Sequence, residues 1–360
     1  MAISRYKPTS LSFRPSPARG GIYAFAVTFA VKSVPRSLGY ARDDMFGKFV
    51  RFLQEIATSH FVLLAMTYFI QVLTMNGIVI IDKPAGWTSQ DVTARLRRVF
   101  NTRRIGHGGT LDPMATGVLP VFVGRATRGV EFFEHAEKIY ETVLKPGITT
   151  DTEDITGTVL TEQDAFVTGE MLEAVLPRFR GEILQIPPMY SALKVDGQKL
   201  YDLARKGKEV ERKPRPITIH ELTLLGMDTE GIRLRVHCSK GTYIRTLCKD
   251  IGQALGCGGC MAQLRRVQAG EYNIGEAVPL SALLESETPE QYLRPVDSMF
   301  RNYPAVTLTT KQEARCRNGN SFTLGMEDGT YRVYGENGEF LALSKVDGGI
   351  MSTIKSFFEV

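Results

Sequence analysis

The segment GHGGTLDPMATGVL, residues 106–119, constrains the fold more than any other, because no regular helix or strand is built from that mixture. Its glycines favour a tight, exposed loop in which the backbone takes positive φ or lets a ligand approach closely. Asp112 precedes Pro113, whose ring disfavours α conformation in the residue before it. The sequence therefore predicts a carboxylate on a stiff, extended corner, which fits either a structural Asp-Pro turn or a catalytic loop.

The apolar run directly after this loop predicts a buried strand over residues 118–123. Pro120 lies within the run and has no N–H to donate to a neighbouring strand. We therefore expect part of this strand to lie at an edge of its sheet or at a bulge.

A helix is predicted just before the loop, because Thr88 or Ser89 can cap its start. Apolar side chains recur at helical spacing at Val92, Leu96 and Val99. Arginines occupy its other faces and the residues that follow: Arg95, Arg97, Arg98, Arg103 and Arg104. Such arginines fit either a solvated face or a phosphate-binding surface, and the sequence leaves both interpretations open.

The rest of the chain mixes short strands and helices. Strands are predicted at 77–82, 138–144, 218–225 and 232–238, and helices at 126–135, 170–180, 200–205 and after 239–247. The basic segment 206–213 fits a solvated loop or an RNA-facing rim. After residue 295 the chain changes to short β runs at 305–308, 330–334 and 340–344, which predict a small C-terminal β domain.

The formal net charge of +5 is unevenly distributed. Residues 1–74 carry nine Lys/Arg and three Asp/Glu, whereas the remaining 286 residues carry 35 basic and 36 acidic side chains. Any RNA-binding surface on the main body must therefore be a local patch, and net charge is no argument for it.

Five cysteines, an odd number in a long chain, do not suggest a disulfide framework, and a reducing compartment fits best. Cys257 and Cys260 have C-x-x-C spacing, but no second pair lies at the spacing that a zinc site requires. The five histidines are scattered along the chain. We therefore expect no metal site.

The string GHGGTLDPMATGVLPV closely resembles the catalytic loop of the TruB family, the tRNA pseudouridine-55 synthases. Further family strings follow in order: KIY at 138–140, TTDTEDITG at 149–157, QIPPMYSALK at 185–194, SKGTYIRTL at 239–247 and MAQLRRVQAG at 261–270. The resemblance runs from Met75 to the end of the chain. Lys145 and Pro146 depart from it, because an apolar residue is more usual there, and this leaves the end of the 138–144 strand uncertain.

This resemblance implies an α+β fold, in which a central mixed, mainly antiparallel sheet is flanked by helices and followed by a small PUA-like β domain. It implies a catalytic domain at 75–298 and a small RNA-binding domain at 299–360. Residues 1–74 are expected to lie outside the native fold, either as a start assigned too early or as a targeting segment. Their apolar runs at 22–31 and 61–73 are shorter than the roughly 18 residues that a membrane span needs.

By resemblance, Asp112 is the essential carboxylate and Arg245 its cationic partner. A carboxylate in this reaction must be ionised, and burial disfavours the charged form, so a cation is expected beside it. The carboxylate attacks the sugar, attacks uracil C6 or removes the 2′ proton, and the sequence does not choose among these.

The resemblance also implies a pocket for a uracil that has been flipped out of the folded RNA. Tyr140 would stack on the base and help to remove the C5 proton, and Tyr243 and Leu264 would complete the pocket. His107 would lie against the RNA where the base was displaced.

The implied reaction converts uridine 55 in the T loop of tRNA to pseudouridine, and it needs no cofactor because nothing is added or lost. The implied partner is tRNA, through its T arm, and we expect a cytoplasmic monomer without membrane or metal. Guide-RNA-dependent relatives share the Asp loop but carry a full PUA domain, and a non-catalytic tRNA-binding module is the alternative outside the enzymes. A nucleotide-phosphate enzyme would need a G-x-x-x-x-G-K-[ST] string, which the sequence does not contain.

Overall fold

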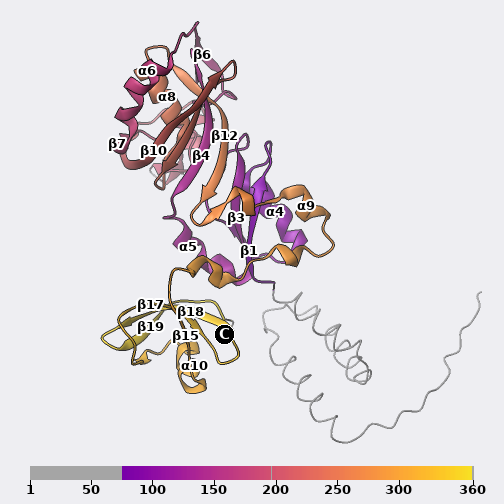
Figure 1. Ribbon diagram of the computed structural model, residues 1–360. Helices are drawn as coiled ribbons and strands as arrows, with labels where there is room; N and C mark the ends of the chain where they lie inside the picture. The colour runs from indigo at the N-terminus through magenta and orange to yellow at the C-terminus, as the bar shows by residue number, and fades with distance from the viewer. Residues whose placement is uncertain (1–74, 196, 359–360) are drawn as a thin grey trace, which may run out of the picture. The chain divides into compact units, whose positions relative to one another are not determined.

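The computed structural model describes residues 75–195 and 197–358 (Figure 1). The expectations for residues 1–74 therefore lie outside the described residues. Within the described ranges no helix is both long and apolar enough to cross a membrane.

A ten-stranded sheet forms the centre of the described chain, in the order β14-β1-β3-β12-β4-β11-β10-β7, with β2 on β3 and β13 on β12. Its strands are β1 (Gly77–Lys83), β2 (Ile105–His107), β3 (Thr116–Val123), β4 (Lys138–Pro146), β7 (Gly181–Gln185), β10 (Arg215–Asp228), β11 (Gly231–Cys238), β12 (Gly259–Ala269), β13 (Tyr272–Asn273) and β14 (Val278–Pro279). The β1–β14 and β3–β12 pairs are parallel and the other pairs antiparallel, which confirms a mixed, mainly antiparallel sheet.

Helices flank this sheet, as predicted. They are α4 (Ser89–Val99), α5 (Val130–Phe133), α6 (Gly169–Val175), α7 (Leu200–Ala204), α8 (Ile244–Ala254) and α9 (Leu280–Glu285), with 3₁₀ turns η1 (Gly124–Gly129), η2 (Leu176–Phe179), η3 (Ile274–Glu276), η4 (Pro289–Tyr292) and η5 (Val296–Phe300). Two short ladders complete this part: β5 (Ile148–Thr150) with β6 (Val159–Glu162), and β8 (Lys194–Val195) with β9 (Gln198–Lys199).

Helix α4 forms for the reasons visible in its sequence. Thr88 is the N-cap, and its side chain and that of Asp91 form a reciprocal capping box. Val92 and Leu96 are fully buried, and burial of each side chain contributes about 1.5–3 kcal/mol. These contacts fix α4 against the sheet directly before the glycine loop.

Strand β3 places Pro120 as the sequence predicted. On one side β3 pairs along its whole length with β1, with Pro120 opposite Ile80. On the other side it pairs with β12 only at Thr116 and Gly117, and with β2 from residue 121 onward. Pro120 therefore lies just beyond the end of the β2 ladder, where its carbonyl accepts from the Gly108 N–H at 2.8 Å and its own missing N–H breaks no ladder hydrogen bond.

A second, five-stranded sheet forms the C-terminal part, in the order β15-β17-β18-β19-β16. Its elements are β15 (Ala305–Thr307), α10 (Thr310–Arg317), β16 (Phe322–Thr323), β17 (Gly329–Tyr334), β18 (Phe340–Asp347) and β19 (Ile350–Ser356). This sheet has its own apolar core, which includes Val333, Leu341 and Val346. The small C-terminal β domain is thus present, and Arg125 contacts Glu339 of this domain at 3.5 Å.

Several elements were not predicted from the sequence: β7, β12, β16, β19 and α10. Strand β12 carries the string MAQLRRVQAG, whose polar residues obscure its alternation, yet it lies between β3 and β4 in the sheet (Figure 1). The predicted helix at 126–135 divides into η1 and α5. Strand β4 continues through Lys145 and Pro146, because Pro146 pairs with Gly259 at the end of the ladder.

Candidate active site

The loop that carries Asp112 is held at several points. The Ala115 N–H donates to the Asp112 carbonyl at 3.1 Å, which closes a turn with Pro113 at its second position. The Leu111 N–H donates to Ser89 Oγ at 2.9 Å, and the Gly86 N–H donates to the Pro113 carbonyl at 2.8 Å. The Asp-Pro turn that the sequence offered as one interpretation is therefore present in the loop that carries Asp112.

Arg245 lies beside Asp112, as the resemblance implied. Its Nε is 3.0 Å from Asp112 Oδ2, and the Arg245 side chain is 7% exposed against 35% for Asp112. Arg245 is in the first turn of α8, and its Nη1 and Nη2 donate to the carbonyls of Thr152 and Tyr190 at 3.2 and 2.9 Å. Asp154 Oδ2 lies 3.9 Å from the same Nε. These contacts fix the guanidinium on three sides, and its Nε faces the loop that carries Asp112.

The acidic hairpin at 149–157 is a capped loop that supports this arginine. Asp154 Oδ1 accepts hydrogen bonds from the Thr152 hydroxyl and from the N–H and hydroxyl of Thr156. Glu153 accepts from Thr246 and Lys249 of α8. Sequence reasoning found the hairpin but missed that Asp154 is a second acid beside Arg245.

The two tyrosines lie within the electrostatic reach of Asp112. Burial raises the pKa of the Tyr140 phenol, an effect that the Arg266 guanidinium opposes and the Asp112 charge reinforces. Burial likewise raises the pKa of Tyr243, with a smaller contribution from Asp112. Gln185 fixes the Tyr243 backbone through a pair of hydrogen bonds, of 3.1 and 2.9 Å. Both phenols are therefore neutral at neutral pH.

Arg266 is an interior cation that sequence reasoning missed. It is 1% exposed, its Nε donates to the Val118 carbonyl at 2.7 Å, and its Nη2 donates to the Gly109 carbonyl at 3.1 Å. It therefore ties β12 to the glycine loop and lies near Tyr140. The signal was available, because Arg266 belongs to the family string at 261–270 and stands two residues after Leu264.

Lys83 is a second buried cation near the loop. Its Nζ donates to the carbonyls of Pro84, Trp87 and Pro113 at 3.0, 2.7 and 3.3 Å. Burial lowers the pKa of Lys83 to about 8, an effect that the Asp112 charge opposes and the Arg266 charge reinforces. Lys83 therefore joins the end of β1 to the Asp-Pro turn.

His107 lies at the other end of the loop, as the last residue of β2. Its Nε2 is 3.4 Å from Gln90 Nε2, and its buried Nδ1 has no hydrogen-bond partner among the described residues. Burial, reinforced by Arg266, lowers the pKa of His107, so its ring is neutral at neutral pH.

Leu264 is 9% exposed and packs in the main core cluster, against which Tyr140 also packs. With Met114 it borders a cavity of about 370 Å³ beside the catalytic loop. The structure thus brings together Asp112, Arg245 and the two tyrosines, with Leu264 nearby. Their chemical roles remain predictions.

The cysteines are all free, and four of the five are buried. Burial raises the pKa of Cys238 to about 11 and that of Cys260 to about 11, so these thiols stay protonated. Within the described ranges no three His, Cys, Asp or Glu side chains are arranged to hold a metal ion.

Comparison with known proteins matches residues 97–244 to the TruB family pseudouridylate synthase N-terminal domain and residues 245–301 to the tRNA pseudouridylate synthase B C-terminal domain. The tRNA pseudouridine synthase B of Stutzerimonas stutzeri is 45% identical over 286 residues, which cover 77% of this chain and 94% of that protein. The enzyme of the same name from Clostridium kluyveri is 42% identical over 275 residues, covering 75% of this chain and 95% of that protein.

Among solved structures, a chain of a Cbf5-Nop10-Gar1 complex superposes with a TM-score of 0.61 at 25% identity, covering 81% of this chain and 87% of that chain. A chain of an H/ACA RNP bound to a substrate RNA containing 2'-deoxyuridine superposes with a TM-score of 0.60 at 24% identity, covering 79% and 86%. The fold predicted by resemblance is therefore confirmed. On the identity and coverage of its curated relatives, the chain belongs to the TruB family of pseudouridylate synthases.

Proposed function

We propose that this enzyme converts uridine 55 in the T loop of tRNA to pseudouridine. The curated relatives that match at 42–45% identity are named tRNA pseudouridine synthase B, and this supports tRNA as the substrate. The observation that carries the chemical part is the 3.0 Å ion pair between Arg245 and Asp112. Asp112 lies on a turn, near the partly buried Tyr140 and Tyr243.

In this proposal Asp112 is the ionised carboxylate that acts on the nucleoside. Arg245 holds the Asp112 carboxylate in place, because its Nε lies 3.0 Å from Asp112 Oδ2. Attack at C1′, attack at uracil C6 and removal of the 2′ proton all begin from this same ionised group. Arg245 is a positioning residue here, since its donors are directed at Asp112 and at two backbone carbonyls.

The remaining side chains form the base pocket. The uridine leaves the RNA stack, because its C1′ is not accessible inside a folded arm. Tyr140 stacks on the uracil and Tyr243 and Leu264 bound the pocket, while His107 lies against the RNA where the base was displaced. The N1–C1′ bond breaks, the uracil turns and C5 bonds to C1′. The C5 proton leaves with the help of the Tyr140 hydroxyl, and N1 takes up a proton. Product and substrate are isomers, so no cofactor takes part.

The domain roles follow from the same proposal. Residues 75–298 form the catalytic domain, and residues 299–360 form a small PUA-like domain that contacts the tRNA outside the T loop. We propose that the enzyme acts as a monomer in the cytoplasm and that residues 1–74 are not needed for the reaction.

The test is site-specific detection of pseudouridine. Unmodified tRNA transcript is incubated with the full chain, with Asp112→Asn and with the matched control Asp228→Asn, and modified positions are mapped by carbodiimide-dependent primer extension stops. Asp228 is an exposed aspartate that also pairs with an arginine, Arg233, at 2.8 Å. We expect one stop, at position 55, with the wild type and the control and none with Asp112→Asn.

Three results would contradict the proposal. Stops at other positions would reject uridine 55, and retained activity of Asp112→Asn would remove Asp112 from its role. Tight tRNA binding without any stop would favour the binding-module alternative. The same assay with a protein that begins at Met75 tests whether residues 1–74 are dispensable.

A further inference from the structure

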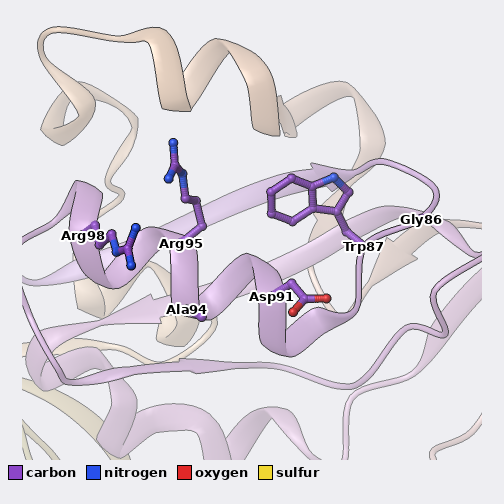
Figure 2. A pocket seen from close by; sticks show the side chains of 6 residues that line it. All are labelled: Gly86, Trp87, Asp91, Ala94, Arg95 and Arg98. Carbon is purple, nitrogen blue, oxygen red and sulfur yellow. The ribbon is translucent and has the colours of Figure 1, made fainter.

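Helix α4 borders a surface pocket of about 430 Å³ outside the site described above (Figure 2). Gly86, Trp87, Asp91, Ala94, Arg95 and Arg98 line it. Figure 2 shows Trp87 and Arg95 side by side, with Arg98 one turn further along the helix. Pockets for small ligands span roughly 300–1,000 Å³, and the volume of this open surface pocket lies in that range.

The two arginines of the pocket are exposed. Neither Arg95 nor Arg98 forms an ion pair or hydrogen bond through its side chain within residues 75–195 and 197–358. Another exposed arginine does pair, Arg233 with Asp228 at 2.8 Å. The positive charge on α4 is therefore available to an external anion.

The one acid in the lining does not neutralise that charge. Asp91 Oδ2 accepts hydrogen bonds from the Thr88 N–H at 3.0 Å and the Thr88 hydroxyl at 2.6 Å. Figure 2 shows its carboxylate pointing away from both guanidinium groups. Asp91 is thus occupied by the capping box of α4, and the arginine side of the pocket remains cationic.

The pocket is joined to the active site by α4 itself. Gln90, one turn before Ala94, is 3.4 Å from His107 of the catalytic loop. Arg103 and Arg104, also exposed and without side-chain partners in the described part of the chain, lead directly into β2, which ends at His107. From Gln90 to Arg98 the helix rises about 12 Å. A strand that leaves the active site past His107 therefore meets Arg98 and Arg95 next.

We propose that this pocket binds one unpaired nucleotide of the RNA substrate, adjacent to the flipped uridine. Its phosphate binds Arg95 and Arg98, whose forked donors suit phosphate oxygens, and its base packs on the Trp87 indole. The inference rests on the proposed function, because it takes the strand at Asp112 to be RNA.

Tryptophan fluorescence reports directly on this pocket, because Trp87 is the only tryptophan in the chain. Full-length protein is titrated with unmodified tRNA and, separately, with uridine monophosphate, while the intrinsic fluorescence is followed. We expect saturable quenching by tRNA and none by the mononucleotide at equal concentration. The pocket is tested with the double variant Arg95→Ala/Arg98→Ala, which removes two exposed side chains.

The double variant should bind tRNA at least tenfold more weakly and lose most of the quenching. Its slope of log K against log salt should fall by about 0.7, since Arg95 and Arg98 bind one phosphate and each single-strand phosphate contributes about 0.7. The charge-matched control Arg178→Ala/Arg180→Ala changes two arginines of the segment before β7, at the far end of the sheet from β1, and should leave affinity and slope as in the wild type.

The outcomes separate the two proposals. A wild type that binds tRNA but forms no pseudouridine rejects the proposed function, whatever the variants do. If the wild type is active and the double variant keeps the wild-type affinity and salt slope, the proposal that this pocket binds a nucleotide of the RNA is wrong. Equal quenching by the mononucleotide and tRNA would assign the pocket to free nucleotides, which also overturns the inference.

Discussion

The same side chain serves two different purposes in two regions of this enzyme. Arg245 and Arg266 are buried, at 6% and 1% exposure, and their donors are taken up by a carboxylate or by backbone carbonyls. Arg95 and Arg98 are exposed on α4 and have no side-chain partner among the described residues. Arg245 and Arg266 contact the loop that carries Asp112. Arg95 and Arg98 belong to α4, which precedes this loop in the sequence.

The difference between them is one of solvation. A buried guanidinium must satisfy its donors within the protein, and it therefore fixes whatever it touches. An exposed one keeps its water and its freedom until an anion arrives. The interior pair should therefore govern rate and stability, whereas the α4 pair should govern affinity for RNA.

The largest effect is expected on catalysis from Arg245→Gln, which removes the charge beside Asp112 but keeps a polar side chain. We expect the rate at saturating tRNA to fall about 10²–10³-fold, as for the loss of one preorganised electrostatic contact. Single-turnover pseudouridylation measures this rate. The control Arg235→Gln removes an exposed arginine paired with Glu141 and should keep the wild-type rate. A loss below about fivefold would mean that Arg245 is not needed to keep Asp112 active.

The next effect is on stability. Arg266→Met leaves the Val118 and Gly109 carbonyls without their donors inside the protein, and we expect the free energy of unfolding to fall by about 2–4 kcal/mol. Arg266→Lys should recover part of this loss, because it keeps one donor group.

Urea unfolding of both variants, with Arg265→Met as control, tests the contrast. Arg265 is next in the chain but its side chain is 40% exposed and paired with Asp82, so its loss should cost less than about 1 kcal/mol. If Arg265→Met and Arg266→Met lower the free energy of unfolding equally, burial does not decide how much each arginine contributes to stability.

Lys83 extends the comparison to a pH-dependent cation. Its pKa is about 8 in the folded protein and 10.5 ordinarily, so between these values the unfolded chain holds a proton that the folded protein has released. Raising the pH across this window therefore stabilises the folded state. The difference in unfolding free energy between the wild type and Lys83→Met should be flat below about pH 8 and rise towards pH 10.5. Urea titrations at several pH values measure this difference. A difference that does not change with pH would contradict the lowered pKa of Lys83 in the folded protein.

The smallest effect is expected from single substitutions on α4. Arg95→Ala or Arg98→Ala should change the free energy of unfolding by no more than about 0.5 kcal/mol, as is usual for exposed positions without partners. The same variants should still bind tRNA more weakly. If either one lowers stability as much as Arg266→Met, the exposed arginines are structural and the comparison fails.

The sequence by itself determined the local features of this enzyme. Glycines and Pro113 in residues 106–119 predicted an irregular loop with an Asp-Pro turn, and Thr88 predicted the start of α4, because turn and cap chemistry depends only on near neighbours. The family strings placed Asp112, Tyr140 and Arg245 in one site and implied the fold that the comparison with solved structures confirms. That inference came from resemblance, since no spacing rule connects residues 133 positions apart.

Only the tertiary structure decided which arginines are buried. Arg265 and Arg266 are neighbours in β12, and strand alternation sends one outward to Asp82 and the other into the core. The buried one is tolerated because β3 pairs with β12 only at Thr116 and Gly117, which leaves the Val118 carbonyl free to accept its Nε. That free acceptor arises from the pairing of strands about 150 residues apart, and hydrogen bonding between such distant segments exists only after the chain has folded.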